Sequence, residues 1–307
     1  MQLADGRVLG YAEFGDPRGA PLMFFHGLPS SRLAAAMLRE PATRLGVRLI
    51  APDRPGIGLS DAAPQRGILD LPQDVEQLAD RLGLDRFALM GISGALPYVC
   101  ACALRIPGRL SATAIVSGLG PLDAPGVLEG MNRESRTLYR MALRSPRFGR
   151  VWMRMFATAA NASPALIFRQ QMSYLPEVDR AVFATPEMRE ARLRDITEAF
   201  RQGPAAACRE TELHVSDWGF ALADVTADII HWQGALDRHH PVAMGRYLAE
   251  ALPNARSIVM PDCGAFGFIE HADELFRLLF EAEVAAPVPT PPVPVLPLAV
   301  PPLAASS

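Results

Sequence analysis

Short apolar runs recur along the chain, and each ends in residues that favour turns. The run Pro21-Leu22-Met23-Phe24-Phe25 has no polar residue, as expected of a strand that is buried on both faces of a sheet. An earlier strand with a hairpin partner is expected at residues 7–14, before a turn at 15–19. Further strands are predicted at 47–52, 86–92, 110–116, 228–234 and 255–260.

Longer segments with apolar residues at helical spacing lie between these strands. In the segment 70–84, Leu71, Val75 and Leu78 recur on one helical face after Asp70, which is a candidate helix cap. Other helices are predicted at 96–105, at 241–252, and from about residue 271 to 284. Strands that alternate with helices in this way predict an α/β fold with a mostly parallel sheet flanked by helices.

The alternation stops between residues 120 and 224, where arginine, methionine and alanine dominate. Helical segments are predicted there at about 129–143, 150–157 and 186–200. This stretch follows the sixth predicted strand and is far longer than an ordinary loop between two elements. We therefore expect residues 1–119 and 225–285 to form the core, and residues 120–224 to form a helical insertion.

Residues 286–307 form a proline-rich, uncharged tail. Prolines at this density exclude a membrane-spanning helix, so the tail is expected to be disordered and extended.

Composition narrows the class of partner. Half of the 307 residues are hydrophobic, which allows a sizeable core, and the formal net charge of −3 gives no sign of nucleic-acid binding. The sequence does not begin with the charged and then apolar segments of a secretion signal. A cytoplasmic protein without a membrane partner is therefore expected. Four cysteines lack the spacing of a zinc site, and no metal is expected. They are Cys100, Cys102, Cys208 and Cys263.

The segment 86–95 carries the candidate chemistry. It begins as an apolar strand, passes through Gly91-Ile92-Ser93-Gly94-Ala95, and continues into a predicted helix. A nucleophilic serine at such a strained strand-to-helix turn needs small residues two positions before and after it, and Gly91 and Ala95 meet that need. The alternative is an ordinary turn between a strand and a helix that happens to contain serine.

Three segments together resemble the α/β-hydrolase superfamily, in its esterase-like and lactonase-like branch with a helical cap. They are His26-Gly27-Leu28-Pro29, Asp53-Arg54-Pro55-Gly56-Ile57-Gly58-Leu59-Ser60 and Gly91-Ile92-Ser93-Gly94-Ala95, and the similarity extends to about residue 285. The resemblance implies an α/β-hydrolase fold in which residues 120–224 are the cap. That cap would cover a site for a small-molecule substrate, and no cofactor is implied.

The same resemblance implies roles for individual residues. Ser93 would be the nucleophile and Asp237 the acid of a triad, although Asp237 could instead cap a helix. The backbone N–H groups of Leu28 and Gly94 would form the oxyanion hole, and His26 would only hold its own loop.

The triad histidine is expected in the loop after the last strand, but that position is Ala265 in the sequence Gly264-Ala265-Phe266. We expect His271 at the surface, His214 in the cap and His231 within the sheet. His239 and His240 follow Asp237 closely and would have to fold back to reach Ser93. His240 is the best of these substitutes.

The sequence thus predicts a serine-hydrolase-type protein for a small apolar ester, lactone or thioester, with the triad base missing. Loss of that base would abolish efficient hydrolysis. The alternatives are an engineered alanine at position 265, a natural non-hydrolytic enzyme such as a cyclase or lyase, and a ligand-binding pseudo-hydrolase. Large apolar residues of the insertion line either the pocket or the insertion's own core: Met131, Met141, Trp152, Met153, Met155 and Phe156.

Overall fold

The computed structural model describes residues 1–281, which contain one seven-stranded sheet. The strand order is β1-β3-β2-β4-β5-β6-β7, and β1 is antiparallel to β3 whereas the other neighbouring strands are parallel. The predicted α/β class with a mostly parallel sheet is therefore confirmed. The strands are β1 (Tyr11–Gly15), β2 (Ala20–Phe25), β3 (Val47–Pro52), β4 (Phe87–Ile92), β5 (Leu110–Val116), β6 (Ile229–Gly234) and β7 (Ala255–Met260).

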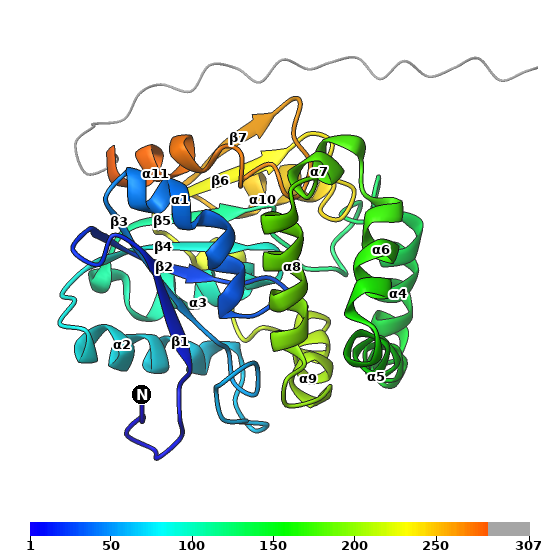
Figure 1. The fold of residues 1–307 in the computed structure, drawn as a ribbon, viewed down its shortest axis with the longest axis horizontal. Coiled ribbons are helices and arrows are strands. Elements are labelled where there is room, and N and C mark those ends of the chain that lie inside the picture. The colour runs from blue at the N-terminus through cyan, green and yellow to red at the C-terminus, as the bar shows by residue number, and fades with distance from the viewer. Residues whose placement is uncertain (282–307) are drawn as a thin grey trace, which may run out of the picture.

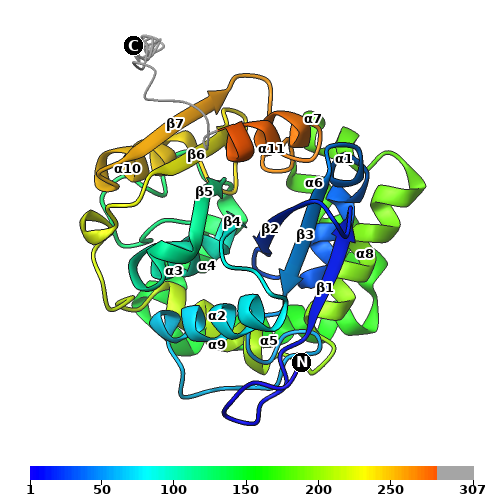
Figure 2. The same ribbon diagram turned by 90° about the vertical axis from the view of Figure 1, so that its left-hand side faces the viewer.

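Helices cover both faces of this sheet (Figure 2). Side chains alternate along each strand, so Met23 and Phe25 of β2 pack into one apolar cluster whereas Leu22 and Phe24 pack into the other. The first cluster is closed by α2 (Leu71–Arg81), α3 (Leu96–Arg105) and α10 (Val242–Ala251). The second is closed by α1 (Arg39–Arg44) and α11 (Ala272–Glu281). Burial on both faces explains why the central strands have unbroken apolar sequences.

Two local expectations need correction. Residues 7–14 do not form a two-stranded hairpin: the segment before β1 makes only an isolated bridge between Gln2 and Val8. The side chain of Asp61 accepts the Val8 N–H at 2.7 Å, so this N–H group is not available for a hydrogen bond between two strands. The side chain of Asp70 does not cap α2. Its carboxylate instead accepts the Gly67 N–H at 2.7 Å and closes the short 3₁₀ turn Ile68–Asp70, which precedes α2.

Six helices lie between β5 and β6, beyond the carboxyl ends of the parallel strands (Figure 1). We call α4–α9 the helical insertion. Three of these helices, α4, α5 and α8, lie near predicted positions, and the other three were not predicted. The helices of the insertion are α4 (Arg133–Arg144), α5 (Pro146–Ala162), α6 (Pro164–Tyr174), α7 (Glu177–Val182), α8 (Pro186–Ala199) and α9 (Ala205–His214).

Within residues 1–281, no helix combines the length and apolar character needed to cross a bilayer. No cluster of three or more His, Cys, Asp or Glu side chains in this range could hold a metal ion. All four cysteines are buried and unpaired. The expectation for residues 286–307 lies outside the described residues.

His231 of β6 links the core to the pH dependence of stability. Its side chain is 1% exposed, and burial lowers its pKa to about 4. Below pH 6.5 the unfolded chain therefore binds more protons at this residue than the native protein does. The unfolding free energy that depends on neutral His231 is fully present above that pH and is lost as the pH falls toward 4. We predict that His231→Leu reduces the loss of unfolding free energy between pH 7 and pH 5 by about 2 kcal/mol.

Urea denaturation at the two pH values measures this difference. Ser257→Ala is the matched control, because Ser257 Oγ lies 3.2 Å from His231 Nδ1 and its removal keeps the titrating ring. An identical pH dependence in His231→Leu and in the unaltered protein would contradict the prediction.

Candidate active site

Ser93 stands at the sharp turn between β4 and α3, as the sequence predicted. Its φ of 54° is a strained left-handed conformation for a residue with a side chain. Gly91 must be glycine here, because a Cβ at that position would lie 2.4 Å from the Val99 side chain. Ala95 is fully buried, and its methyl group fits where a small residue was expected. The backbone thus presents the Ser93 hydroxyl at the carboxyl end of the sheet.

A histidine does reach Ser93, and this corrects the expectation that no base faces it. Nε2 of His240 lies 2.8 Å from Ser93 Oγ, and Nδ1 of the same ring lies 3.1 Å from Oδ2 of Asp237. The three side chains form a continuous chain of hydrogen bonds. The acid and the histidine are only three residues apart and come from the same loop, between β6 and α10.

The chain does fold back after Asp237 so that His240 reaches Ser93, and the Asp237 carboxylate itself produces this turn. Its Oδ1 accepts the backbone N–H groups of His239 at 2.7 Å and His240 at 2.9 Å. These two bonds turn the chain tightly around the carboxylate. The side-chain amide of Gln233 in β6 donates to the His240 carbonyl and anchors the loop to the sheet. The His240 ring is therefore directed toward Ser93 instead of outward.

Electrostatics support an ionised Asp237. The residue is fully buried, and burial alone would raise its pKa. Attraction to the His240 ring and the hydrogen bonds from it outweigh that effect and hold the pKa of Asp237 below its ordinary value. A carboxylate in this position fixes the orientation of the ring and stabilises its protonated form.

Ala265 lines the same pocket as Ser93 and His240, but another side chain is bound to its loop. The carboxylate of Asp179, in α7, accepts the N–H of Ala265 at 3.0 Å and that of Phe266 at 2.8 Å. A Cβ on Gly264 would lie within 2.4 Å of this carboxylate. Burial, together with the negative charge of Asp237, raises the pKa of Asp179 to about 6. The loop after β7 thus binds the helical insertion.

The segment after β2 lies against Ser93. A Cβ on Gly27 would be 3.2 Å from Ser93 Cβ, and one on Gly94 would be 3.2 Å from Leu28 Cβ. The two segments expected to supply backbone N–H groups therefore meet beside the serine. The peptide bond after Leu28 is cis, leading into Pro29.

Two insertion helices bind this segment. Asp195 of α8 is fully buried and accepts hydrogen bonds from the hydroxyl of Ser30 and from the N–H of Ser31, the latter at 2.7 Å. Glu210 of α9 pairs with the buried Arg54. Arg54 in turn donates to the carbonyls at positions 26 and 27.

The remaining histidines have other surroundings. His26 is buried, with Nδ1 2.9 Å from the Gly27 carbonyl oxygen, and burial lowers its pKa well below the ordinary range. His214 of α9 lies 2.8 Å from the Gly94 carbonyl oxygen and connects the insertion to the turn at Ser93. His271 is partly exposed at the start of α11. Together with His231 in the sheet, these placements agree with the expected regions, and none of these rings contacts the Ser93 hydroxyl.

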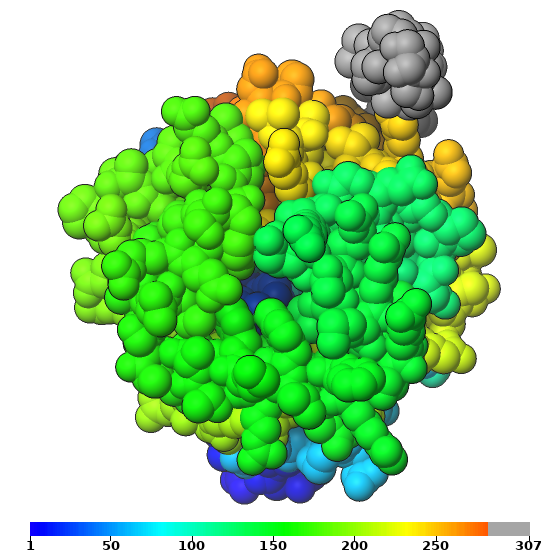
Figure 3. Space-filling model, turned by 90° about the vertical axis from the view of Figure 1, so that its right-hand side faces the viewer, coloured from blue at the N-terminus to red at the C-terminus, as the bar shows by residue number. Residues whose placement is uncertain are grey.

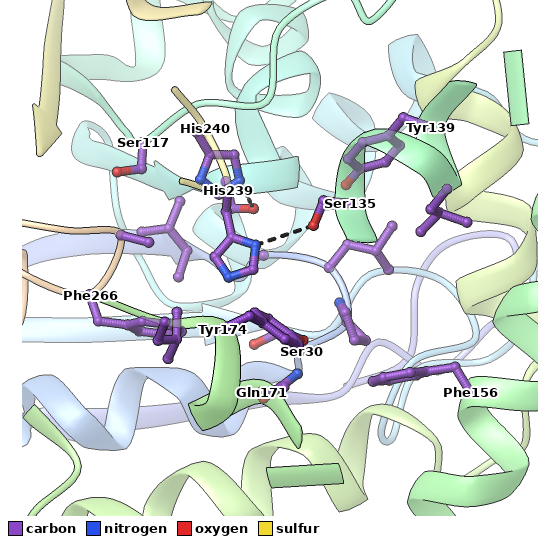
Figure 4. Close-up of a pocket in the computed structure, with 18 of the residues that line it drawn as sticks. Ser30, Ser117, Ser135, Tyr139, Phe156, Gln171, Tyr174, His239, His240 and Phe266 are labelled. Atoms are coloured by element: carbon purple, nitrogen blue, oxygen red, sulfur yellow. Dashed lines mark hydrogen bonds between the residues drawn. The ribbon is translucent and has the colours of Figure 1, made fainter. Parts of the chain in front are cut away.

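Ser93, His240 and Ala265 line a cavity of about 170 Å³ between the sheet and the insertion. Figure 3 shows the opening between the insertion helices. His239 projects into the cavity near Tyr174 and is drawn with its contact to Ser135 in Figure 4. Burial lowers the pKa of His239 to about 4, so this ring is neutral at pH 7.

Only three of the six apolar residues singled out in the insertion lie in the expected environments. Trp152, Met153 and Phe156 line the cavity, and Met153 also belongs to the insertion's own core. Met131 packs into the main core, whereas Met155 is 69% exposed and contributes to neither. Met141 is also exposed.

Two polar atoms of the cavity wall have unused hydrogen-bonding capacity within residues 1–281. They are the Ser117 hydroxyl, at the end of β5, and Nε of Arg192, in α8. The Arg192 side chain is 9% exposed, and its charge is shared with Asp195 at 2.6 Å. Sequence analysis missed both groups, because no motif marks them.

Comparisons with known proteins agree with this architecture. A family model described as alpha/beta hydrolase fold matches residues 20–272. The chain is 28% identical over 254 residues to a 2-hydroxy-6-oxo-6-phenylhexa-2,4-dienoate hydrolase of Burkholderia cepacia, covering 78% of each protein. It is 29% identical over 281 residues to a 2-hydroxymuconate semialdehyde hydrolase of Pseudomonas putida, covering 87% of this chain and 89% of the other.

Solved structures share the fold at lower identity. A thermophilic esterase from Thermogutta terrifontis has a TM-score of 0.62 at 20% identity and covers 92% of this chain and 97% of its own. The epoxide hydrolase VrEH1 from Vigna radiata has a TM-score of 0.63 at 18% identity, covering 91% and 94%.

The contact between Asp179 and the loop after β7 can be tested directly. We predict that Asp179→Ala speeds amide hydrogen exchange at Ala265 and Phe266 and lowers the unfolding free energy by about 1–3 kcal/mol at pH 7, because two buried N–H groups lose their acceptor. Glu177→Ala, an exposed change on the same helix, is the matched control. Unchanged exchange at both amides would show that this contact does not hold the loop.

Proposed function

This chain belongs to the alpha/beta hydrolase fold family, and from that premise we propose that it is a serine hydrolase with Ser93 as nucleophile, His240 as general base and Asp237 as the orienting acid. The observation that carries the proposal is the hydrogen-bonded chain from Ser93 Oγ through His240 to the Asp237 carboxylate. Asp237 is the expected acid, and His240 would take the role that the resemblance assigned to the position of Ala265.

The reaction follows from this geometry. His240 Nε2 takes the Ser93 proton while Oγ attacks the substrate carbonyl carbon, and the carbonyl oxygen becomes an oxyanion. The backbone N–H groups of Leu28 and Gly94 would donate to that oxygen. The protonated ring then gives its proton to the leaving group, and an acyl group remains on Ser93. A water molecule, deprotonated by His240, hydrolyses this ester and restores the serine.

The cavity favours a small acyl group. Its volume of about 170 Å³ and the side chains of Trp152, Phe156 and Phe266 suit a small, mostly apolar ester, lactone or thioester. Residues 120–224 would act as the cap that covers this site and selects the substrate. The non-hydrolytic and ligand-binding alternatives depended on a missing base, and the His240 contact removes that reason for preferring them.

Arg192 favours a second candidate within the same reaction class. Its Nε has no hydrogen-bond partner among the described residues, and its side chain lines the cavity. A substrate carboxylate would satisfy this donor. The relative from Burkholderia cepacia is named as a hydrolase of a dienoate, which is a carboxylate. A small keto acid cleaved next to its ketone, with Ser93 and His240 in the same roles, is therefore the second candidate.

The position of the base gives the main test. We predict that His240→Ala lowers kcat/KM for p-nitrophenyl acetate at least about a thousandfold, because the serine loses its proton acceptor. Ala265→His, which would create the usual arrangement, should change the same constant less than about tenfold because a base is already present. If kcat/KM rose strongly in Ala265→His and stayed unchanged in His240→Ala, His240 would not be the base.

Covalent labelling tests the nucleophile. A fluorophosphonate probe should react stoichiometrically with the unaltered protein, and mass spectrometry should locate the label on Ser93. Ser93→Ala should not react, and His240→Ala should react far more slowly, because Ser93 is then not activated. Labelling at another residue would remove Ser93 from this role.

The acid is tested by a nearly isosteric change. We predict that Asp237→Asn lowers kcat on the order of 10⁴-fold with little change in KM, because an amide no longer fixes the reactive orientation of the ring. Circular dichroism and thermal unfolding establish that the variant folds. A folded Asp237→Asn variant with full activity would exclude this role for the acid.

Substrate class is tested at α8. We predict that Arg192→Gln raises KM more than tenfold for a substrate that carries a carboxylate, but less than threefold for p-nitrophenyl acetate. Arg194→Gln, an exposed change on the same helix, is the control. Equal effects of Arg192→Gln on both substrates would leave the small neutral ester as the better candidate.

A further inference from the structure

Large apolar side chains gather on the outer surface of the helical insertion. Of the ten large hydrophobic side chains exposed within residues 1–281, six belong to α4, α5 and α6. Four of them follow the helical spacing i, i+3, i+4 and i+7 along α5, so they form one exposed stripe. The stripe consists of Phe148, Val151, Trp152 and Met155. A stripe of this kind on a surface helix normally faces a partner.

The three helices that carry these side chains are also strongly basic. Residues 130–176 contain eight arginines and one acidic residue, in a chain whose net charge is −3. Seven of these arginines are exposed, and within residues 1–281 only Arg150 makes an ion pair, with Glu212. The exposed arginines are Arg133, Arg140, Arg144, Arg147, Arg150, Arg154 and Arg169. We call this combination of the stripe and the arginines the basic–apolar face.

The basic–apolar face adjoins the entrance to the cavity. Trp152 is 40% exposed on the stripe, yet it also lines the cavity and stacks on Phe156 with ring centroids 5.3 Å apart. Figure 3 shows the opening among the helices of the insertion. Whatever covers this face would therefore lie beside the route by which a substrate enters.

We propose that the basic–apolar face docks on an anionic lipid surface, with the cavity entrance turned toward the bilayer. Exposed aromatic and aliphatic side chains beside arginines are the pattern of a helix that lies in the membrane interface. Arginines at this position are attracted by anionic headgroups, and the apolar stripe would enter the boundary with the acyl chains. The docking would be peripheral. It differs from the expectation of no membrane partner, which rested on the lack of a leader pattern and of a spanning helix.

Other occupants fit less well. Two copies meeting through this face would bring arginines against arginines, and no acidic cluster lies within residues 130–176 to offset them. Residues 282–307 contain one charged residue, Glu283, and cannot neutralise the face. An acidic protein would match the charge. It would also need a groove for four protruding apolar side chains, whereas a lipid interface accommodates them without a shaped partner.

Vesicle sedimentation with the full chain tests the proposal. Vesicles of phosphatidylcholine alone are compared with vesicles that contain one third phosphatidylglycerol, at low and high salt. We expect binding to the anionic vesicles at least tenfold stronger than to the neutral ones, and its loss at high salt, where charge attraction is screened. Equal or absent binding to both vesicle types would overturn the proposal, and absent binding would leave an acidic protein as the better occupant.

Variants then locate the contact. Phe148→Ser/Met155→Ser and Arg144→Gln/Arg147→Gln should each weaken binding to anionic vesicles at least tenfold. Val259→Ser and Arg18→Gln/Arg246→Gln remove an exposed apolar group and exposed charges elsewhere, and they should bind as the unaltered protein does. Thermal unfolding checks that each variant folds. Equal weakening in test and control variants would overturn the assignment to this face.

Tryptophan fluorescence provides an independent readout. Trp152 is exposed, whereas Trp218 and Trp232 are buried, so a blue shift on addition of anionic vesicles reports on the basic–apolar face. No shift despite sedimentation would place the lipid contact on another surface and overturn the proposal. Because vesicle binding needs no turnover, the Ser93→Ala protein should give the same results. A failure of docking is thereby distinguished from a failure of the proposed hydrolysis.

Discussion

The site depends on the hydrogen bonds that the buried Asp237 carboxylate accepts from its own loop. Two come from backbone N–H groups and one from the ring of His240. The backbone bonds form the tight turn, and the ring bond directs the imidazole toward Ser93. The same carboxylate therefore shapes the loop and orients the His240 ring. A buried carboxylate is costly unless its hydrogen-bonding capacity is used, and here these partners meet that cost.

Three further buried acidic side chains connect the helical insertion to the core, and each comes from a different helix. Asp179 of α7 binds the loop after β7, Asp195 of α8 binds the segment after β2, and Glu210 of α9 pairs with Arg54. All three are buried, so removing one partner would leave an uncompensated polar or charged group. These contacts reach the segment after β2 and the loop after β7, and both segments line the cavity beside Ser93. Placement of the insertion and geometry of the site are therefore linked through specific polar bonds as well as through apolar packing.

The sequence predicted the structure best at positions where local sterics or burial allow only one type of residue. Gly91 and the apolar runs predicted the turn at Ser93 and the parallel sheet, because local sterics and burial on both faces decide them. It was least informative where the partner is distant in the chain. Ala265 stands where the resemblance implied a histidine, but nothing local shows that Asp237 bends its loop so that His240 reaches Ser93. Nor does any pattern pair Asp179 with a loop 86 residues away.

The position of the histidine has a structural consequence for the rest of the site. In a triad whose base follows the last strand, the loop after that strand must hold an imidazole against the acid. Here the acid and His240 share one loop, so the segment around Ala265 does not have to present a side chain to Ser93. Its backbone N–H groups instead bind Asp179. Gly264 is needed for that contact, because any Cβ there would strike the carboxylate. With the proposed base on the Asp237 loop, the loop after β7 is available to hold the insertion over the cavity.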